Sequence, residues 1–343
     1  MNTIPIIFNE KISPYTAVGK KERAASSGIS AVVINRPGLS KRTIFQEIEK
    51  TGFDNIISIE SCSPNYEIEE LIKRFPFVRF ILPENQLSLG EQINLAAFEI
   101  ESPLFFVMYS DIKIIAGGNA VRMAERLSVN NEENENTKKN HGFKRLCTVP
   151  FILNSNYEIL PTLTALVTYK KKIRTFLTEP RDDGDIALYP FDGIGIYDRQ
   201  RFINSGGFDT SLKHSYWQLL DFGFRANLWG EEIAFNNHYK LSYEHEHPRE
   251  NYSIKDCYKR FYLKNLAPVF KNDHARLPIY RFPGFYSIAG VDLSSAWNEF
   301  KENKKWVKIN QYRWKSDARG VIKRWDTSNI SDTSILPFDS TEE

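Results

Sequence analysis

Acidic residues at the ends of predicted strands carry the strongest chemical signal in this sequence. Asp111 closely follows the apolar run Leu104–Met108, and Glu60 closes a similar run that starts at Asn55. Because ligands of parallel α/β sheets bind beyond the carboxyl ends of the strands, we expect both carboxylates to face one cleft. A carboxylate there suits a divalent cation, Mn²⁺ or Mg²⁺, which would neutralise a diphosphate leaving group. A capping or turn aspartate is the alternative for Asp111.

Two histidines form a second group of candidate metal ligands. His245 and His247 alternate with glutamates in Tyr243–Pro248, so on a strand both histidines would share one face. Two imidazoles at this spacing suit a borderline metal but need a further ligand. Two exposed surface histidines at a strand end are the alternative interpretation.

The elements that must position these residues follow an alternating pattern, which predicts an α/β fold with a mainly parallel sheet flanked by helices. Short apolar runs predict strands at Ile29–Asn35, Asn55–Glu60, Phe77–Leu82 and Leu104–Met108. Helical periodicity predicts helices at Lys41–Lys50, Ile68–Phe75 and Ser88–Ile100. Further sheet segments are expected at Leu146–Leu153 and Asp192–Tyr197, followed by a turn at Ser205–Gly207 and a helix at Trp217–Trp229.

Composition excludes several classes of protein. Of the 343 residues, 41% are hydrophobic and 26% are charged, as in folded globular proteins. Because 45 Lys and Arg balance 43 Asp and Glu, for a net charge of +2, we expect no nucleic-acid partner. The apolar runs are far shorter than the ~20 residues that span a bilayer. Three widely spaced cysteines and a first segment unlike a signal peptide predict a cytoplasmic protein.

The chain divides into four predicted regions. Residues 1–28 form an N-terminal extension, 29–250 the main domain, 251–325 an aromatic and basic helical extension, and 326–343 a disordered tail. Within the extension, a single helical stripe indicates a helix that packs on the main domain, or one that contributes to peripheral contact with an anionic membrane through 297–325. The stripe consists of Trp314, Ala318, Val321, Ile322 and Trp325.

These features together resemble the GT-A-type glycosyltransferases, especially family 2. In that family a nucleotide-binding strand ends in an Asp and a small polar loop, to which Ile59–Asn65 is similar, with Glu60 in place of the Asp. An Asn on a helix precedes, by a nearly fixed interval, a strand that ends in Asp-x-Asp, and Asn94 and Tyr109–Asp111 keep that interval. The resemblance implies that Asp111 binds the metal, with His245 or His247 as a further ligand. It implies nucleotide-binding roles for Asn35, Glu60, Ser63 and Asn94.

A second block resembles the acceptor side of the family. Phe191–Asp209 contains Asp192 and ends in Gly206-Gly207-Phe-Asp, and Trp217–Arg225 is similar to the helix Glu-Asp-x-Asp-x-x-x-Arg. The resemblance places Asp192, Gly206, Gly207 and Trp217 on the acceptor side. Gln218 and Leu219 stand where the family has the Glu-Asp pair that supplies the catalytic base, and Tyr109 replaces the first acid of Asp-x-Asp. Asp221 is the nearest remaining carboxylate and is our predicted base; its alternative is a structural pair with Arg225 at i, i+4.

The resemblance therefore implies a metal-dependent, inverting glycosyltransferase. Its donor would be a nucleotide-diphosphate sugar and its acceptor a glycan or a lipid-linked glycan, reached at the inner face of a membrane. The alternative is a GT-A-shaped binding or scaffold protein without activity, which Tyr109, Gln218 and Leu219 favour. A nucleotidyltransferase ranks last, because Asn35–Gly38 contains a single glycine rather than a glycine-rich phosphate loop.

Overall fold

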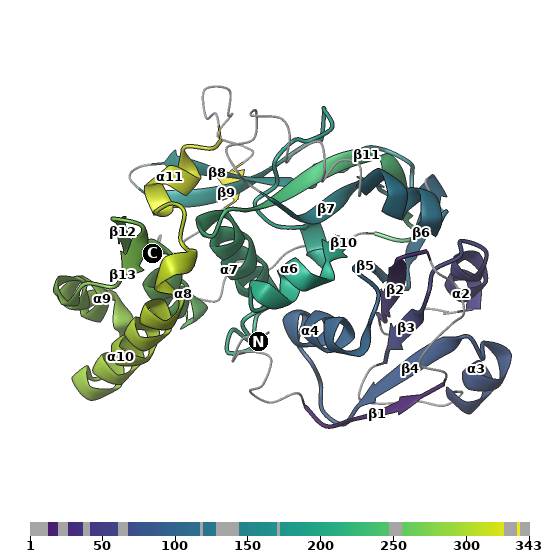
Figure 1. Ribbon diagram of the computed structural model, residues 1–343, viewed down its shortest axis with the longest axis horizontal. Coiled ribbons are helices and arrows are strands. Elements are labelled where there is room, and N and C mark those ends of the chain that lie inside the picture. The colour runs from purple at the N-terminus through teal and green to yellow at the C-terminus, as the bar shows by residue number, and fades with distance from the viewer. Residues whose placement is uncertain are drawn as a thin grey trace.

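The structure is a computed structural model that describes residues 13–19, 27–36, 42–60, 68–116, 119–127, 144–169, 172–246, 256–325 and 335–336. Its centre is a nine-stranded mixed sheet with helices packed against it (Figure 1). The strand order is β1-β4-β3-β2-β5-β10-β7-β11-β6.

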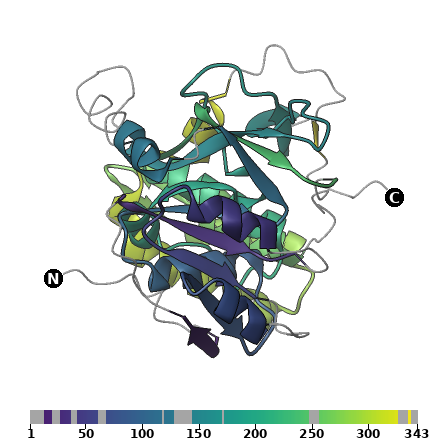
Figure 2. The ribbon, with the colours of Figure 1, turned by 90° about the vertical axis from the view of Figure 1, so that its right-hand side faces the viewer.

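Half of this sheet is parallel and contains the four strands predicted first. They are β2 (Ile29–Ile34), β3 (Ile56–Ile59), β4 (Val78–Pro83) and β5 (Leu104–Tyr109). Every residue of β2 and β3 is buried, which explains why both read as continuous apolar runs. The connecting helices are α2 (Arg42–Glu49), α3 (Ile68–Arg74) and α4 (Leu89–Glu99), close to the predicted bounds. Figure 2 turns this half of the sheet toward the viewer.

The other strands are mostly antiparallel, so the sheet is mixed. The short strand β10 (Gly195–Asp198) lies between β5 and β7 (Lys144–Leu153) and is antiparallel to both. β11 (Glu231–Tyr243) runs parallel to β7, and β6 (Ile112–Ala116) forms the far edge antiparallel to β11. At the opposite edge β1 (Tyr15–Val18), from the predicted N-terminal extension, pairs with β4.

A small second sheet corrects one expectation. It consists of β8 (Leu163–Tyr169), β9 (Lys172–Thr178) and β14 (Ile335–Leu336), in the order β14-β9-β8. The predicted disordered tail 326–343 was therefore wrong for residues 335–336, which pair with β9. The remainder of that tail lies outside the described residues.

The C-terminal extension packs at the end of the molecule beside α7 (Ser215–Leu228) (Figure 1). Trp314 and Val321 of the predicted stripe are buried in the core, but the single helix was wrong, because Trp314 is extended and the helix covers only Ala318–Ile322. None of the helices in the described ranges is long and apolar enough to cross a membrane. The extension contains α8 (Asp256–Phe261), the π-helix η2 (Tyr262–Leu266), β12 (Val269–Lys271), β13 (His274–Arg276), η3 (Ile279–Arg281), α9 (Phe282–Ala289), α10 (Leu293–Asn310), η4 (Gln311–Arg313) and α11 (Ala318–Ile322).

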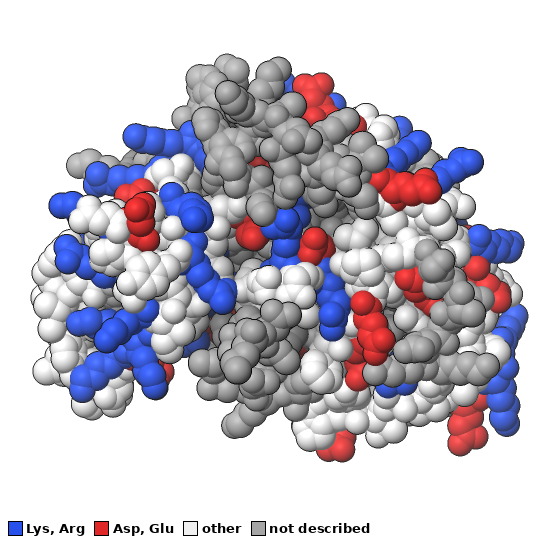
Figure 3. Space-filling view, viewed as in Figure 1, with Lys and Arg blue, Asp and Glu red and all other residues white. Residues whose placement is uncertain are grey.

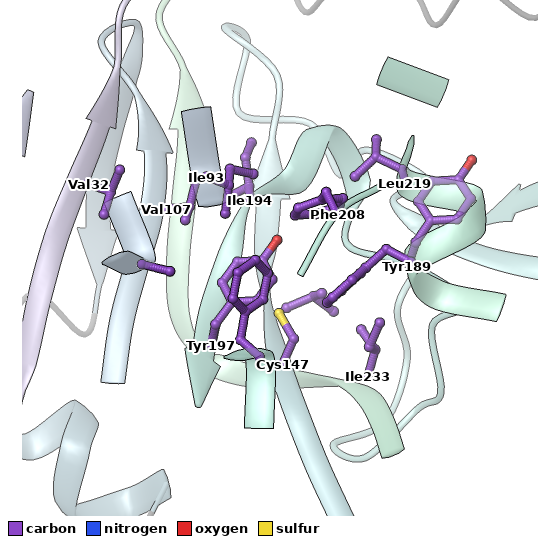
Figure 4. Packing of buried hydrophobic residues seen from close by; sticks show 14 of the residues in the cluster. Val32, Ile93, Val107, Cys147, Tyr189, Ile194, Tyr197, Phe208, Leu219 and Ile233 are labelled. Atoms are coloured by element: carbon purple, nitrogen blue, oxygen red, sulfur yellow. The ribbon is translucent and has the colours of Figure 1, made fainter. Parts of the chain in front are cut away.

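The core joins the two halves of the sheet around β10. The ring of Tyr197 stacks on that of Phe105 with centroids 5.0 Å apart, and Phe208 and Phe222 stack at 4.4 Å. A Cβ at Gly195 would lie only 2.7 Å from the Cys147 sulfur, so glycine allows β10 to approach β7 this closely. Figure 4 shows Tyr197, Cys147 and Phe208 within this core. Because Gly195 pairs with Val107 of β5, the segment before β10, η1 (Phe191–Gly193), lies toward the carboxyl end of β5.

Candidate functional site

The carboxyl ends of β2 and β3 meet through Asn35 and Glu60. The Asn35 side-chain amide donates to Glu60 Oε1 at 3.0 Å and to Ser58 Oγ at 2.9 Å. Ser58 in turn donates to Glu60 Oε1 at 2.8 Å. The two predicted nucleotide-binding residues therefore lie together at the expected edge of the sheet, whereas Ser63 lies outside the described residues.

Arg36 connects this edge to Asp111 on the other side of β2. Its main-chain N–H donates to Ser110 Oγ at 3.3 Å, and its guanidinium donates to Asp111 Oδ2 at 2.6 Å. The guanidinium also bonds to Asp192 and lies 3.8 Å from the ring centroid of Tyr109. Glu60 and Asp111 are thus linked through the consecutive residues Asn35 and Arg36.

Asp192 enters the site from η1 in a left-handed backbone conformation, with φ of 53°. The hydroxyls of Tyr109 and Tyr243 each donate to its carboxylate at 3.1 Å. Burial raises the pKa of Asp192 to about 6, against the opposing effect of Arg36 and the two tyrosine hydroxyls. Tyr109, which replaces an acid of the family motif, therefore serves to orient an aspartate from a distant segment.

Two buried polar atoms at this edge lack a hydrogen-bond partner among the described residues. They are Oδ1 of Asn35 and Oδ1 of Asp111. Their residues follow β2 and β5, which are neighbouring parallel strands. Because buried polar groups in folded proteins are almost always hydrogen-bonded, two orphaned oxygens at adjacent strand ends indicate a place for a polar ligand.

The donor set around Asp111 fits a divalent cation that takes most of its ligands from elsewhere. Arg36 occupies Asp111 Oδ2, which leaves the buried Oδ1 for an ion. Magnesium-type sites commonly use one or two carboxylates and complete their shell with substrate phosphates and water. Within the ranges that the structure describes, no three His, Cys, Asp or Glu side chains cluster closely enough to hold an ion by themselves.

Of the two histidines predicted as metal ligands, the structure describes His245 but not His247. Glu244 donates its main-chain N–H to the carbonyl oxygen of Asp111 at 2.8 Å, which brings the chain at His245 beside the site. The His245 side chain is exposed. His247 lies outside the described residues, so its role as a metal ligand stays a prediction.

The predicted acceptor-side turn is held by buried contacts. Gly206 and Gly207 have φ of 85° and 60°, and the Gly207 carbonyl accepts from Arg225 at 2.6 Å. The Asn94 carboxamide both accepts from and donates to the main chain of Phe208, each at 2.9 Å. In this structure Asn94 orients the turn; its contact with a nucleotide stays a prediction.

Gln218 and Trp217 of α7 both have buried structural partners. Gln218 donates to Ser88 Oγ at 2.8 Å and accepts from the Gly90 N–H at 2.9 Å, so it ties α7 to the start of α4. Trp217 is buried against Phe261, with ring centroids 5.8 Å apart. Trp217 therefore supports the C-terminal extension rather than presenting a surface to an acceptor.

Asp221, the predicted base, is entirely buried within an ionic network. One carboxylate oxygen accepts from Arg225 at 3.3 Å and Lys264 at 3.2 Å, and the other accepts from Asn265 at 2.7 Å. Asp221 therefore forms the structural pair with Arg225 that was the alternative to a role as base. Lys264 also binds Asp209 at 2.7 Å. Burial alone would raise the pKa of Asp209, but Lys264 and Arg260 hold it well below its usual range.

The sequence did not reveal two residues of this site. Arg36 directly follows Asn35 at a strand end, and that position was the available signal. Tyr243 ends β11 and reaches Asp192 across the fold, and nothing in its local sequence indicates this contact.

Comparisons with known proteins address the fold. The structure resembles the crystal structure of GalNAc-T7 with UDP, GalNAc and Mn²⁺, with a TM-score of 0.53 and 13% identity over 82% of this chain. The fold is of the GT-A type. This chain spans 56% of the GalNAc-T7 chain. The Staphylococcus aureus TarS 1–349 structure in complex with UDP-GlcNAc gives a TM-score of 0.45 and 12% identity, covering 80% of this chain and 71% of that one. No family model matches the sequence, and neither does any curated protein.

The GT-A-type fold confirms the fold expected from the resemblance. Within this fold the polar site lies at the carboxyl ends of the parallel strands, because Asn35, Glu60 and Asp111 follow β2, β3 and β5. Asp192 reaches the same edge from the other half of the sheet, where η1 precedes β10.

Proposed function

We propose that this protein is a glycosyltransferase that moves a sugar from a nucleotide-diphosphate donor to a hydroxyl of a glycan or lipid-linked acceptor. The observation that carries the proposal is the pair of buried, unpartnered oxygens of Asn35 and Asp111 at neighbouring strand ends. The GT-A-type fold supports it, as does the presence of UDP and Mn²⁺ in the GalNAc-T7 structure.

The proposed donor site uses the residues at the ends of β2, β3 and β5. Asn35 and Glu60 bind the nucleoside, with Ser63 and Asn94 as further predicted contacts. Asp111 holds a Mn²⁺ or Mg²⁺ ion, with His245 or His247 as a further ligand. When bound, the ion neutralises charge on the diphosphate as it leaves. Arg36 lies beside Asp111 and supplies a fixed positive charge for the same diphosphate.

We assign the acceptor proton to Asp192. A carboxylate with a pKa of about 6 is mostly ionised at neutral pH and is a stronger base than an ordinary aspartate. In the proposed step the acceptor oxygen attacks the anomeric carbon, the bond from that carbon to the diphosphate oxygen breaks, and the hydroxyl proton passes to Asp192. Inversion at the anomeric carbon follows from a single displacement. Asp221 remains the competing candidate for the base.

A specific observation favours a second candidate function. Gln218 and Asp221 are both committed to buried structural contacts, which leaves α7 without an available acid where the resembling family has its base. A GT-A-shaped protein that binds a donor or glycan without turnover has the same features. The two functions differ in whether donor is consumed.

A donor screen followed by a turnover assay tests the proposal. UDP, GDP and CDP are compared with their monophosphates by thermal unfolding, with and without Mn²⁺. At about 100 times the dissociation constant, one diphosphate should add about 2.7 kcal/mol of stability when Mn²⁺ is present. The matching nucleotide sugar should then be hydrolysed or transferred. Stabilisation without any turnover supports the binding protein, and no stabilisation by any nucleotide refutes the transferase.

A further inference from the structure

Large apolar side chains are exposed together in one short segment of the C-terminal extension. Elsewhere in the described structure, exposed residues of this kind occur singly or in pairs, such as Tyr157 with Ile159 and Ile309 with Tyr312. Single exposed apolar residues are normal, but a group of them usually marks an interaction site. Between 39% and 66% of the residue surface is exposed at Ile279, Tyr280, Tyr286, Ile288, Val291 and Leu293.

Other residues of this segment make its contacts with the core. Phe285 and Ala289, one turn apart on α9, are fully buried, and the Phe285 ring lies 6.3 Å from that of Phe300 on α10. Tyr286 and Ile288 are exposed and lie on opposite flanks of the same helix. The exposed apolar side chains therefore add little to the core of this chain.

A basic row continues from the apolar segment along α10. Its members recur at i, i+4, i+8, i+11 and i+15, which places them on one face of a helix. At ~100° per residue, Glu299 and Glu302 lie about 140° or more from the centre of that face. In Figure 3, blue Lys and Arg atoms gather over the end of the molecule formed by α9 and α10, with few red atoms among them. The row begins with the apolar residues Leu293 and Trp297, and its basic members are Lys301, Lys304 and Lys308.

Cations and aromatic rings also meet at the border of the apolar segment. The Arg281 guanidinium lies 5.7 Å from the ring centroid of Tyr280, and the Lys301 ammonium lies 5.4 Å from that of Trp297. Tyr and Trp are the aromatic residues that favour the boundary between water and hydrocarbon, and long basic side chains extend from there to the headgroups.

We propose that Ile279–Leu293 and the basic row of α10 form one docking surface for an anionic lipid bilayer. The apolar residues enter the boundary between headgroups and acyl chains, while the lysines contact lipid phosphates. Charge argues for this occupant over a second copy of the chain, because a two-fold dimer through this surface would bring two lysine rows toward each other. The inference is independent of the transferase proposal.

Vesicle sedimentation of the full chain without substrates tests the docking surface. Vesicles of phosphatidylcholine with about a third phosphatidylglycerol should bind the protein, and pure phosphatidylcholine should bind it much more weakly. Ile288→Ser with Leu293→Ser should weaken binding at least about 10-fold. Lys304→Gln with Lys308→Gln should weaken it about 25-fold, at about five-fold per charge, and more so at low salt.

Matched controls separate docking from general surface effects. Val121→Ser with Ile159→Ser removes two exposed aliphatic residues elsewhere, and Lys50→Gln with Lys73→Gln removes two exposed charges; both should bind vesicles like the wild type. Melting temperatures verify that each variant folds. Absence of binding to the anionic vesicles overturns the proposal, as does equal weakening by the controls. A vesicle-independent dimer that Ile288→Ser with Leu293→Ser dissociates would assign the surface to a second copy instead.

Discussion

The guanidinium of Arg36 lies 2.6 Å from the carboxylate of Asp111, across the carboxyl ends of two neighbouring parallel strands. The same guanidinium pairs with Asp192, which arrives from the antiparallel half of the sheet. One cation therefore compensates two largely buried carboxylates. The positive charge that pairs with these carboxylates comes from a single residue, Arg36, so replacing Arg36 tests the arrangement.

Replacement of Arg36 by Gln should raise the pKa of Asp192 above about 6, because Arg36 now opposes the effect of burial. Loss of a counter-ion from two carboxylates should also lower the free energy of unfolding by about 1–3 kcal/mol. Carboxyl NMR titration and urea unfolding measure the two effects. Arg79→Gln is the matched control: it breaks a partly buried pair with Glu99 and should leave the pKa of Asp192 unchanged.

Asp111→Asn should weaken binding of the donor diphosphate in Mn²⁺ by about 10- to 100-fold, because a charged ligand of the ion becomes neutral while its shape is kept. Calorimetry with and without Mn²⁺ measures this change. Asp182→Asn, at an exposed turn, serves as the control and should bind like the wild type. Undiminished, metal-independent binding by Asp111→Asn would show that the metal assignment is wrong.

The two candidate bases predict opposite results in single-turnover experiments. Asp192→Asn should lower the rate constant by about 100-fold or more while the donor still binds, as general-base catalysis contributes about 10²- to 10⁴-fold. Asp221→Asn should leave turnover per folded molecule nearly unchanged and lower stability, because it disturbs a buried network with Lys264 and Arg225. A normal rate in Asp192→Asn with a large loss in Asp221→Asn would return the role of base to Asp221.

Asp192 should also give folding a distinct pH dependence. Its pKa is about 6 in the folded protein against an ordinary value of 3.8, so the folded state takes up a proton first as the pH falls. The penalty of burying its charge is present above about pH 6 and is relieved between about pH 6 and pH 4. Relative to Asp192→Asn, the wild type should therefore gain stability from about pH 7 to about pH 5. Urea unfolding at both values measures the difference, and parallel pH curves would contradict the assignment.

Lys264→Met should lower the free energy of unfolding by about 3–5 kcal/mol, since it leaves Asp209 and Asp221 buried with less compensating charge. The exposed pair Lys213–Glu91 provides the control, and Lys213→Met should cost about 1 kcal/mol or less. Because the pKa of Asp209 is lowered, its stabilising effect is present above its ordinary pKa and is lost as the pH falls. The Lys264→Met variant should accordingly lose less stability in acid than the wild type.

The parallel half of the fold was predictable because its information is local. β2 and β3 are buried on both faces and therefore read as apolar runs, and Asp111 and Glu60 could be placed from the ends of such runs. The pairing of β7 with β10 and β11 could not be read in this way, because antiparallel and parallel partners leave similar apolar patterns. The sheet is consequently more mixed than the sequence indicated.

The chemistry of the site was less predictable than its location. The contact between Arg36 and Asp192 joins residues 156 positions apart, so no local pattern encodes it. Resemblance identified Asp221 as the base from its position in a motif, but a motif does not state whether a side chain is exposed. The burial of Asp221 and its contact with Lys264 arise only once the C-terminal extension has folded against α7.

The position of β10 has a consequence for how the chain is made. β5 is complete at Tyr109, yet its partner on one side begins only at Gly195. A nascent chain that ends between these points carries β5 as an open edge, and such edges pair with other chains. Long-range pairing of this kind slows folding and prolongs the exposure of partly folded intermediates. Release of β10 from the ribosome should therefore be the event that covers the open edge of β5 and brings Asp192 to Arg36, whereas β6 and β11 pair only later.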